Sequence, residues 1–285
     1  MSTEKDPILE CNVARALVLA FDGLEYDLVE KWNLKNIKQK VYGKYLAPVS
    51  PRHGKPHTPS AWVSFITGKS VEEHGIDDWW TYGKLNRIFN WLRWKPPFIW
   101  IKGKRKLLRK IGLGPQIHTK KDLKVRTIFD VVKPSIALNI PAYNEPLSYH
   151  IELEKALEKG LNEYERKIWE IHRRRVKALM ENINKEWKLL MAWFDLADLL
   201  GHIYMVKNPL RLLRGYLELN RLVGRVSKIT GKDTFIIVVS DHGMKPAGST
   251  GDHSKYGFYS FNMNVGYKPK RITDFYKLIL KIIGQ

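Results

Sequence analysis

Cysteine is almost absent from the 285-residue chain, which contains only Cys11. One cysteine cannot form an internal disulfide, so the chain is not a disulfide-stapled secreted scaffold. The absence of any CxxC pair excludes a zinc finger. Long apolar runs are also missing: the first one ends at Asp22 after about six residues, whereas a membrane span needs roughly 20. We therefore expect a soluble, cytoplasmic protein.

Acidic residues are scarce relative to basic ones. The chain has 29 Asp and Glu against 49 Lys and Arg, which gives a formal net charge of +20 at pH 7. Such a surplus predicts an anionic partner: nucleic acid, an acidic membrane surface or a phosphorylated small molecule. Apolar residues make up 44% and aromatic residues 12% of the chain, so it is not a disordered polybasic tail and can bury a substantial core.

Four short apolar runs, rich in β-branched or aromatic residues, predict buried parallel strands. They are residues 16–21, 136–140, 189–194 and 235–239. Helical patterns lie between them, at residues 59–67, 151–185 (one or two helices) and 210–229. The run Arg173-Arg174-Arg175 with interspersed Glu predicts a plain charged helix face. Alternating strands and helices predict an α/β fold, a three-layer α/β/α sandwich around a mostly parallel central sheet.

One segment differs from the rest in composition. Residues 91–126 contain 12 Lys or Arg against one acidic residue, a net +11, and five of the ten tryptophans lie in or just before this segment. We interpret residues 79–126 as a basic, aromatic-rich insertion or cap on a single domain that spans residues 1–285. Cations mixed with aromatics are typical of segments that contact an anionic membrane surface or, less favoured here, nucleic acid. A solvated insertion that packs its aromatics on the main domain explains the composition equally well.

Polar residues follow three of the four predicted strands. They are Asp22 after the first, Asp195, Asp198 and His202 after the third, and Asp241, His242 and, further on, His253 after the fourth. Open parallel sheets bind ligands outside the carboxyl ends of their strands. A single aspartate there is usually a cap or a turn residue, but this many carboxylates and imidazoles at one edge predict a metal site. The donor set suits Zn, Mn or Fe better than Ca or Mg.

A hydroxyl nucleophile is available at the start of the predicted helix 59–67. Thr58 precedes Pro59, at a position where free backbone N–H groups and the helix dipole favour an anion. An ordinary Thr cap followed by Pro at the first helical position has the same sequence. From spacing alone, both interpretations of Thr58 stay open.

Five sequence blocks, in order, resemble the alkaline phosphatase superfamily and, within it, the type I phosphodiesterase/nucleotide pyrophosphatase branch. They are LVLAFDGLEYD, HTPSAWVSFITGKSVEEHGI, DLLGH, SDHGM and GDHSKYGFYS. The resemblance implies a metal-dependent, phosphodiesterase-like hydrolase that uses Thr58 as its nucleophile, with a phosphothreonine intermediate. It also implies two divalent ions, Zn first and Mn or Fe as alternatives. One ion would be held by Asp198, His202 and His253, and the other by Asp22, Thr58, Asp241 and His242.

The chain departs from the branch near the nucleophile. Members with nucleotide substrates tend to carry an Asn three residues after the nucleophile, and here that residue is Ala61. A backbone N–H at the helix start, or the side chains of Lys55, His57 and Lys255, would then hold the phosphate oxygens. No Arg follows Thr58 before residue 87, whereas alkaline phosphatase proper places one there for a dianionic monoester. We therefore expect a diester or another monoanionic phosphoryl substrate.

Two alternatives to a phosphodiesterase stay open. One is a phosphomonoesterase of the same fold. The other is a basic nucleic-acid- or membrane-binding protein on a degenerate phosphatase scaffold, although such a scaffold normally loses ligands and none is missing here. We expect residues 91–126 to lie over the active site and to select an anionic substrate, with a peripheral membrane contact as a further expectation. The sequence does not predict the oligomeric state.

Overall fold

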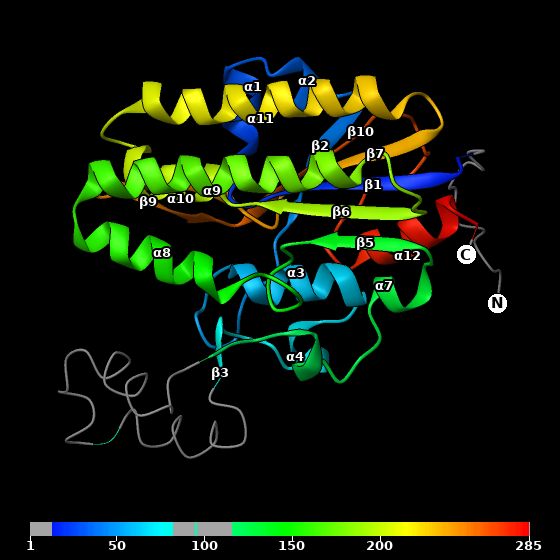
Figure 1. Ribbon diagram of the computed structural model, residues 1–285, viewed down its shortest axis with the longest axis horizontal. Coiled ribbons are helices and arrows are strands. Elements are labelled where there is room, and N and C mark those ends of the chain that lie inside the picture. Colours follow the sequence, from blue (N-terminus) through cyan, green and yellow to red (C-terminus); the bar gives the residue numbers. More distant parts are fainter. Residues whose placement is uncertain (1–12, 82–94, 96–115, 285) are drawn as a thin grey trace.

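The computed structural model describes residues 13–81, 95 and 116–284. At its centre lies a six-stranded sheet in the order β2-β10-β7-β1-β6-β5 (Figure 1). Its strands are β1 (Arg15–Phe21), β2 (Val41–Leu46), β5 (Ser135–Leu138), β6 (Leu189–Phe194), β7 (Thr234–Val239) and β10 (Tyr256–Phe261). Strands β5, β6, β1 and β7 are parallel, whereas β10 and β2 form an antiparallel edge. The sheet is mostly parallel, as predicted.

The central strand β1 shows why these runs are apolar throughout. Every residue from 16 to 21 is fully buried. Successive side chains of a strand point to opposite faces of the sheet. The residues at 17, 19 and 21 therefore pack into the core on one face, and those at 16, 18 and 20 pack into the core on the other. Because both faces are covered, neither set can be polar.

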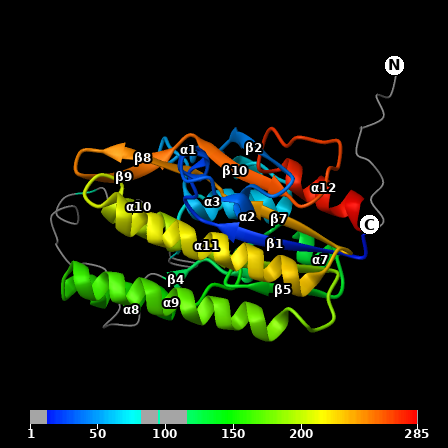
Figure 2. The same cartoon turned by 90° about the horizontal axis from the view of Figure 1, so that it is seen from above.

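Helices cover both faces of the sheet (Figure 1). One layer contains α1 (Tyr26–Lys31), α2 (Lys35–Lys38), α9 (Leu161–Asn182), α10 (Leu196–Tyr204) and α11 (Pro209–Thr230), and the other contains α3 (Thr58–Thr67), α7 (Ile128–Val131) and α12 (Asp274–Ile282). Helix α8 (Leu147–Glu158) packs on α9, and α4 (Val71–His74) packs on α3. Figure 2 shows α9 and α11 running alongside each other over the sheet. The predicted three-layer α/β/α sandwich is confirmed.

The predicted strands match the observed ones with one difference at a strand end. The predicted runs 16–21, 189–194 and 235–239 fall within β1, β6 and β7. The predicted run 136–140 stops before Asn139, because Asn139 has a φ of 59°, which a strand cannot continue. The side chain of Asn144 closes the turn: it accepts a hydrogen bond from the N–H of Ile140 and donates one to the carbonyl of Ala137.

The predicted helices are also present. Residues 210–229 lie within α11, and residues 151–185 divide into α8 and α9 at Gly160, whose φ is 113°. Helix α3 begins at Thr58, one residue earlier than predicted, and His57 occupies the N-cap position. None of the helices in the described part of the chain is both long enough and apolar enough to span a membrane.

Two small ribbons extend from the sandwich. In the first, β3 (Trp80–Thr81) pairs antiparallel with β4 (Gln116–Ile117), and the 3-10 helix η3 (Lys120–Asp122) follows. This ribbon brings together the two sides of residues 82–115, as an insertion requires. Most of the basic segment 91–126 lies outside the described residues, so its role as a cap stays a prediction. The second ribbon is the antiparallel hairpin of β8 (Gly243–Ala247) and β9 (Thr250–Ser254).

Candidate active site

The polar residues predicted at strand ends gather at the carboxyl edge of the parallel sheet. Asp22 directly follows β1, and Asp241 lies just beyond the end of β7. Asp198 and His202 lie one turn apart on α10, which begins shortly after β6. His253 is carried by the hairpin β8–β9, which lies at the same end of the molecule as α10 (Figure 2).

The first cluster contains the predicted nucleophile. His242 Nε2 lies 3.2 Å from Asp22 Oδ1 and 3.4 Å from Asp241 Oδ2. The Thr58 hydroxyl lies 3.3 Å from Asp22 Oδ1 and 3.4 Å from His242 Nε2. All four side chains are buried. Because His57 holds the N-cap position, the Thr58 hydroxyl is not the helix cap and faces the carboxylate instead.

The second cluster consists of Asp198, His202 and His253. Asp198 Oδ1 lies 3.4 Å from His202 Nε2 and 3.5 Å from His253 Nε2. The two Nε2 atoms are 3.2 Å apart. The ring of His253 stacks on the ring of His242, with 3.7 Å between their centroids. The two clusters are therefore neighbours, and the structure brings together every residue predicted as a metal ligand.

Backbone carbonyls orient the three imidazoles. Nδ1 lies 2.9 Å from the Gly251 carbonyl in His202, 2.8 Å from the Pro56 carbonyl in His253 and 3.0 Å from the Gly243 carbonyl in His242. A carbonyl only accepts, so Nδ1 carries the hydrogen in each ring, and in a neutral ring Nε2 is then an acceptor. These acceptors face carboxylates and one another, an arrangement that is repulsive unless a proton or a metal cation lies between them.

Unpartnered carboxylate oxygens support the same interpretation. Both side-chain oxygens of Asp241 and Oδ1 of Asp198 are buried without a hydrogen-bond partner among the residues that the structure describes. A buried carboxylate oxygen without a partner is costly. Coordination to a divalent cation would supply the partner. The residues present therefore fit a metal ion in each cluster.

The pKa values reflect this crowding. Burial raises the pKa of Asp22 and Asp241 well above the usual range, and the charge of a neighbouring aspartate raises each further. Burial opposes ionisation of Asp198 too, but His202 and His253 hold its pKa well below the usual range. Burial lowers the pKa of His202, yet the charge of Asp198 outweighs it and raises the pKa to about 9. Without a cation, His202 is protonated near pH 7, and a metal ion would displace that proton.

Glu25 supports the hairpin that carries His253. Its Oε2 accepts hydrogen bonds from the N–H of Met244 on β8, at 2.9 Å, and from the hydroxyl of Ser254 on β9, at 2.8 Å. A Cβ at Gly243 would lie 2.1 Å from this oxygen, so a larger residue there would push the Glu25 carboxylate away from its two donors. This role of Glu25 is not predictable from the sequence, because its partners lie 219 and 229 positions further along the chain.

A pocket of about 290 Å³ opens onto the clusters. It is lined by Asp22, His57, Thr58, Trp79, His150, Leu153, Trp193, Asp195, Asp198, Leu199, His202 and His253. An aromatic wall forms part of the lining: the centroid of the Trp79 ring lies 4.7 Å from that of His150 and 6.2 Å from that of Trp193. This wall is not predictable from the sequence. Its one available signal was the position of Trp193 near the end of a predicted strand.

The three residues predicted to bind substrate lie in different places. His57 lines the pocket, and burial lowers its pKa to about 3, so its ring is neutral near pH 7. Lys55 lies 2.6 Å from Asp252 in an exposed ion pair. Lys255 lines a different pocket, where its ammonium lies 5.2 Å from the ring centroid of Tyr256. Only His57 of the three therefore faces the pocket of the two clusters, and all three roles stay predictions.

A mostly parallel α/β/α sandwich that gathers carboxylates, imidazoles and a buried threonine hydroxyl at its carboxyl edge defines an alkaline phosphatase-like protein. The family model for type I phosphodiesterase/nucleotide pyrophosphatase matches residues 16–256. The chain therefore belongs to this family, as the sequence blocks predicted. None of the curated proteins matches the chain in sequence.

Solved structures align with most of the chain. Murine ectonucleotide pyrophosphatase/phosphodiesterase 5 aligns with a TM-score of 0.50 and 16% identity, over 82% of this chain and 58% of that one. Phosphonoacetate hydrolase from Sinorhizobium meliloti 1021, in complex with phosphonoformate, aligns with a TM-score of 0.47 and 14% identity, over 84% of this chain and 58% of that one. The chain thus spans little more than half the length of these neighbours.

Proposed function

We propose that the protein is a hydrolase of phosphate diesters, with Thr58 as its nucleophile and one divalent metal ion in each carboxylate–histidine cluster. The observation that carries the proposal is the Thr58 hydroxyl, which is buried, lines the pocket and lies 3.3 Å from Asp22. Family membership supports the reaction class. Zinc is the first candidate, ahead of manganese and iron, because the ligands combine imidazole with carboxylate.

Divalent ions in the clusters would lower the pKa of a bound hydroxyl and stabilise negative charge that develops at phosphorus. The protein itself supplies the nucleophile. Oγ1 of Thr58 loses its proton and forms a bond to phosphorus while the bond to the leaving oxygen breaks on the opposite side, and that oxygen takes up a proton and departs as an alcohol. Water then breaks the Oγ1–P bond of the phosphothreonine, which regenerates the hydroxyl and releases a phosphate monoester. The N terminus of α3, which begins at Thr58, favours the phosphate oxygens through its dipole.

The pocket favours a diester over a monoester. Its described lining contains no lysine or arginine, whereas a monoester dianion carries one more negative charge than a diester. Trp79, Leu153 and Trp193 offer an apolar surface to a second substituent. We therefore propose a diester whose substituents include an apolar or aromatic group. Family membership adds nucleotide pyrophosphates to the substrates worth testing.

A binding protein on a degenerate scaffold is less well supported. Such a protein has no need to keep a complete ligand set, yet all the predicted ligands are present and lie in two compact clusters. Both clusters also open onto the pocket, through Asp22 from the first and His253 from the second. A surface that only bound a polyanion would have no use for this arrangement.

Substrate hydrolysis by metal-loaded protein tests the proposal. The rates for bis(p-nitrophenyl) phosphate and p-nitrophenyl phosphate are compared in the presence of zinc, manganese or iron, and we expect the diester to be preferred. Thr58→Ala should lower kcat at least about 1000-fold. Ser60→Ala is the matched control, because this buried hydroxyl on the same helical turn donates only to the His57 carbonyl. An unchanged rate in Thr58→Ala at equal metal content would refute the nucleophile.

A further inference from the structure

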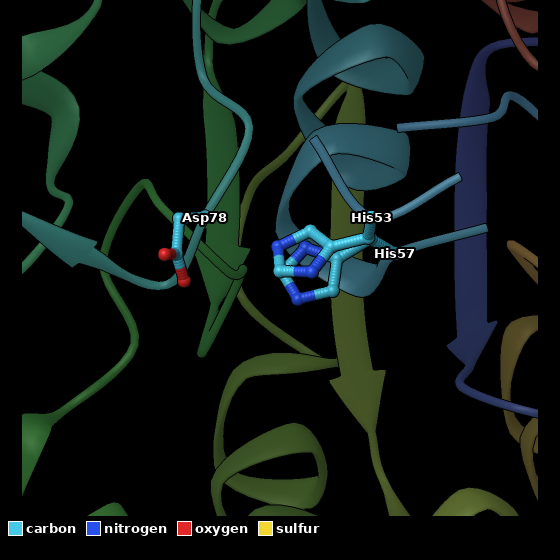
Figure 3. A group of neighbouring side chains, drawn as sticks. All are labelled: His53, His57 and Asp78. Carbon is cyan, nitrogen blue, oxygen red and sulfur yellow. The ribbon is translucent and has the colours of Figure 1, made fainter. Parts of the chain in front are cut away.

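A third group of potential metal ligands lies beside the predicted nucleophile. His53, His57 and Asp78 each offer a ligand atom, and these atoms lie within 4.8 Å of one another. None of the three belongs to the two clusters described above. Figure 3 shows the two imidazole rings lying one over the other, with the Asp78 carboxylate level with them.

The loop that carries His53 is held by its own backbone. The N–H of Ser50 donates to the Lys55 carbonyl at 3.0 Å, and the N–H of Gly54 donates to the Ser50 carbonyl at 2.9 Å. Gly54 has a φ of 65°, which lets the chain turn back. The ring of His53 then stacks on that of His57, with centroids 4.1 Å apart and planes at 20°. The turn thus places His53 beside His57, the N-cap residue of α3.

His57 and Asp78 each have lone pairs available to bind a cation. Nδ1 of His57 is buried and has no hydrogen-bond partner within the described residues. In Asp78, Oδ1 accepts a hydrogen bond from the N–H of Trp79 at 2.7 Å, and Oδ2 lies 2.9 Å from Nη1 of Arg52. Each carboxylate oxygen has two lone pairs, so Asp78 can bind a cation and keep both partners.

We propose that His53, His57 and Asp78 bind a third divalent cation, of the borderline class that prefers imidazole and carboxylate, with Zn²⁺ first. Three such ligands leave the fourth position of a tetrahedral ion open. Zinc lies about 2.0–2.2 Å from its ligands, so the three donor atoms must draw closer and the stacked rings must turn until the ion lies in both ring planes. His53 is exposed and can turn without disturbing the core.

The location of this third site gives it a consequence for substrate binding. His57 directly precedes Thr58 and lines the pocket of the two clusters. A cation held by His57 would place positive charge beside the N terminus of α3, where the described pocket lining has no lysine or arginine. This consequence rests on the proposed function. The binding of the ion itself does not.

Zinc stoichiometry tests the third site. The metal-free full-length chain is equilibrated with Zn²⁺, and unbound zinc is removed. The zinc content of the protein is then measured by inductively coupled plasma mass spectrometry. His53→Ala and Asp78→Asn should each hold one zinc ion fewer than the wild type. Asp77→Asn is the matched control, because this adjacent carboxylate lies outside the group and accepts the N–H of Arg52 at 2.9 Å. Its zinc content should equal that of the wild type.

The same comparison keeps this inference separate from the proposed function. A difference of one zinc ion between the wild type and both variants supports the third site, whatever the catalytic rate. Equal zinc content in the wild type, His53→Ala and Asp78→Asn overturns the third site and leaves the two-cluster proposal untouched. Anomalous scattering from zinc-loaded crystals gives a second readout: a peak between His53, His57 and Asp78 is expected, and its absence beside occupied clusters also overturns the site.

Discussion

Gly23 connects the two predicted metal clusters at the scale of a single residue. It directly follows Asp22, and its φ is 67°. A Cβ at this position would come within 2.7 Å of the Cα of Asp198 and 2.8 Å of its Cβ. Glycine is therefore required twice, for the left-handed conformation and for the close approach of the two ligand-bearing segments.

The variant Gly23→Ala should separate Asp22 from Asp198 and weaken metal binding. We expect a loss of stability of about 1–3 kcal/mol together with a measurable drop in zinc content. Gly231→Ala is the matched control, because Gly231 has a φ of 72° but no atom within 4 Å of its would-be Cβ. The variant Gly231→Ala introduces only backbone strain and should retain the zinc content of the wild type. Urea unfolding and metal analysis measure both variants, and equal zinc loss in the two would contradict the argument from close approach.

At the scale of elements, helix α9 supports one wall of the pocket through a buried ion-pair network. Arg175 is fully buried, and its Nη2 lies 2.9 Å from Glu145 Oε1 and 3.1 Å from Asp195 Oδ2. Its guanidinium also lies 4.4 Å from the ring centroid of Trp193. The other oxygen of Glu145 lies 3.1 Å from Nε2 of His150. Because Asp195, Trp193 and His150 line the pocket, the network positions that wall.

Removing the cation from this network should be costly. Arg175→Met leaves two buried carboxylates without their partner, and we expect it to lower the free energy of unfolding by about 3–5 kcal/mol. Arg174→Met changes the adjacent residue, whose partly exposed ion pair with Glu152 should contribute at most about 1 kcal/mol. Urea denaturation of both variants measures the difference. Similar losses of unfolding free energy in the two variants would show that the buried ion pairs of Arg175 contribute no more to stability than the ion pair of Arg174.

The same helix shows where prediction from sequence ends. Buried strands such as β6 are predictable, because a short apolar run with polar ends is compatible with few other structures. The clustering of the candidate ligands is predictable too, because they follow the ends of parallel strands. The run 173–175 was interpreted as a plain charged face, and for Arg175 that interpretation is wrong. Only the packing of α9 against the sheet buries Arg175 while it leaves Arg174 partly exposed. Such burial depends on residues 145 and 195, which no local pattern connects.

At the scale of the whole molecule, the positive charge is unevenly distributed. Residues 91–126 carry +11 of the net +20. The predicted insertion 79–126 that contains them begins at Trp79, which lines the pocket immediately before β3. The residue at which this predicted insertion leaves the body of the protein is thus part of the pocket wall. This favours an anionic partner that acts at the pocket over a polyanion that wraps the whole surface.

The two clusters also link the stability of the whole molecule to pH. The pKa of His202 is about 9 in the metal-free fold, against 6.5 for an ordinary histidine. Its protonation therefore stabilises the fold fully below about pH 6.5, and this contribution is lost as the pH rises through 9. The raised pKa values of Asp22 and Asp241 act in the same direction. The metal-free protein should accordingly become less stable between pH 6.5 and pH 9.

Zinc should reverse this trend, because it replaces the protons that these groups would otherwise hold. We expect the increase in Tm on adding zinc to be larger at pH 9 than at pH 6.5. Thermal unfolding with EDTA, or with zinc at a fixed free concentration, measures this increase at each pH. In His202→Gln the pH dependence of the increase should be flatter, since one of the competing protons is gone. An increase in Tm that is the same at both pH values would mean that metal binding releases no protons from these clusters, and the ligands would then have to be sought elsewhere.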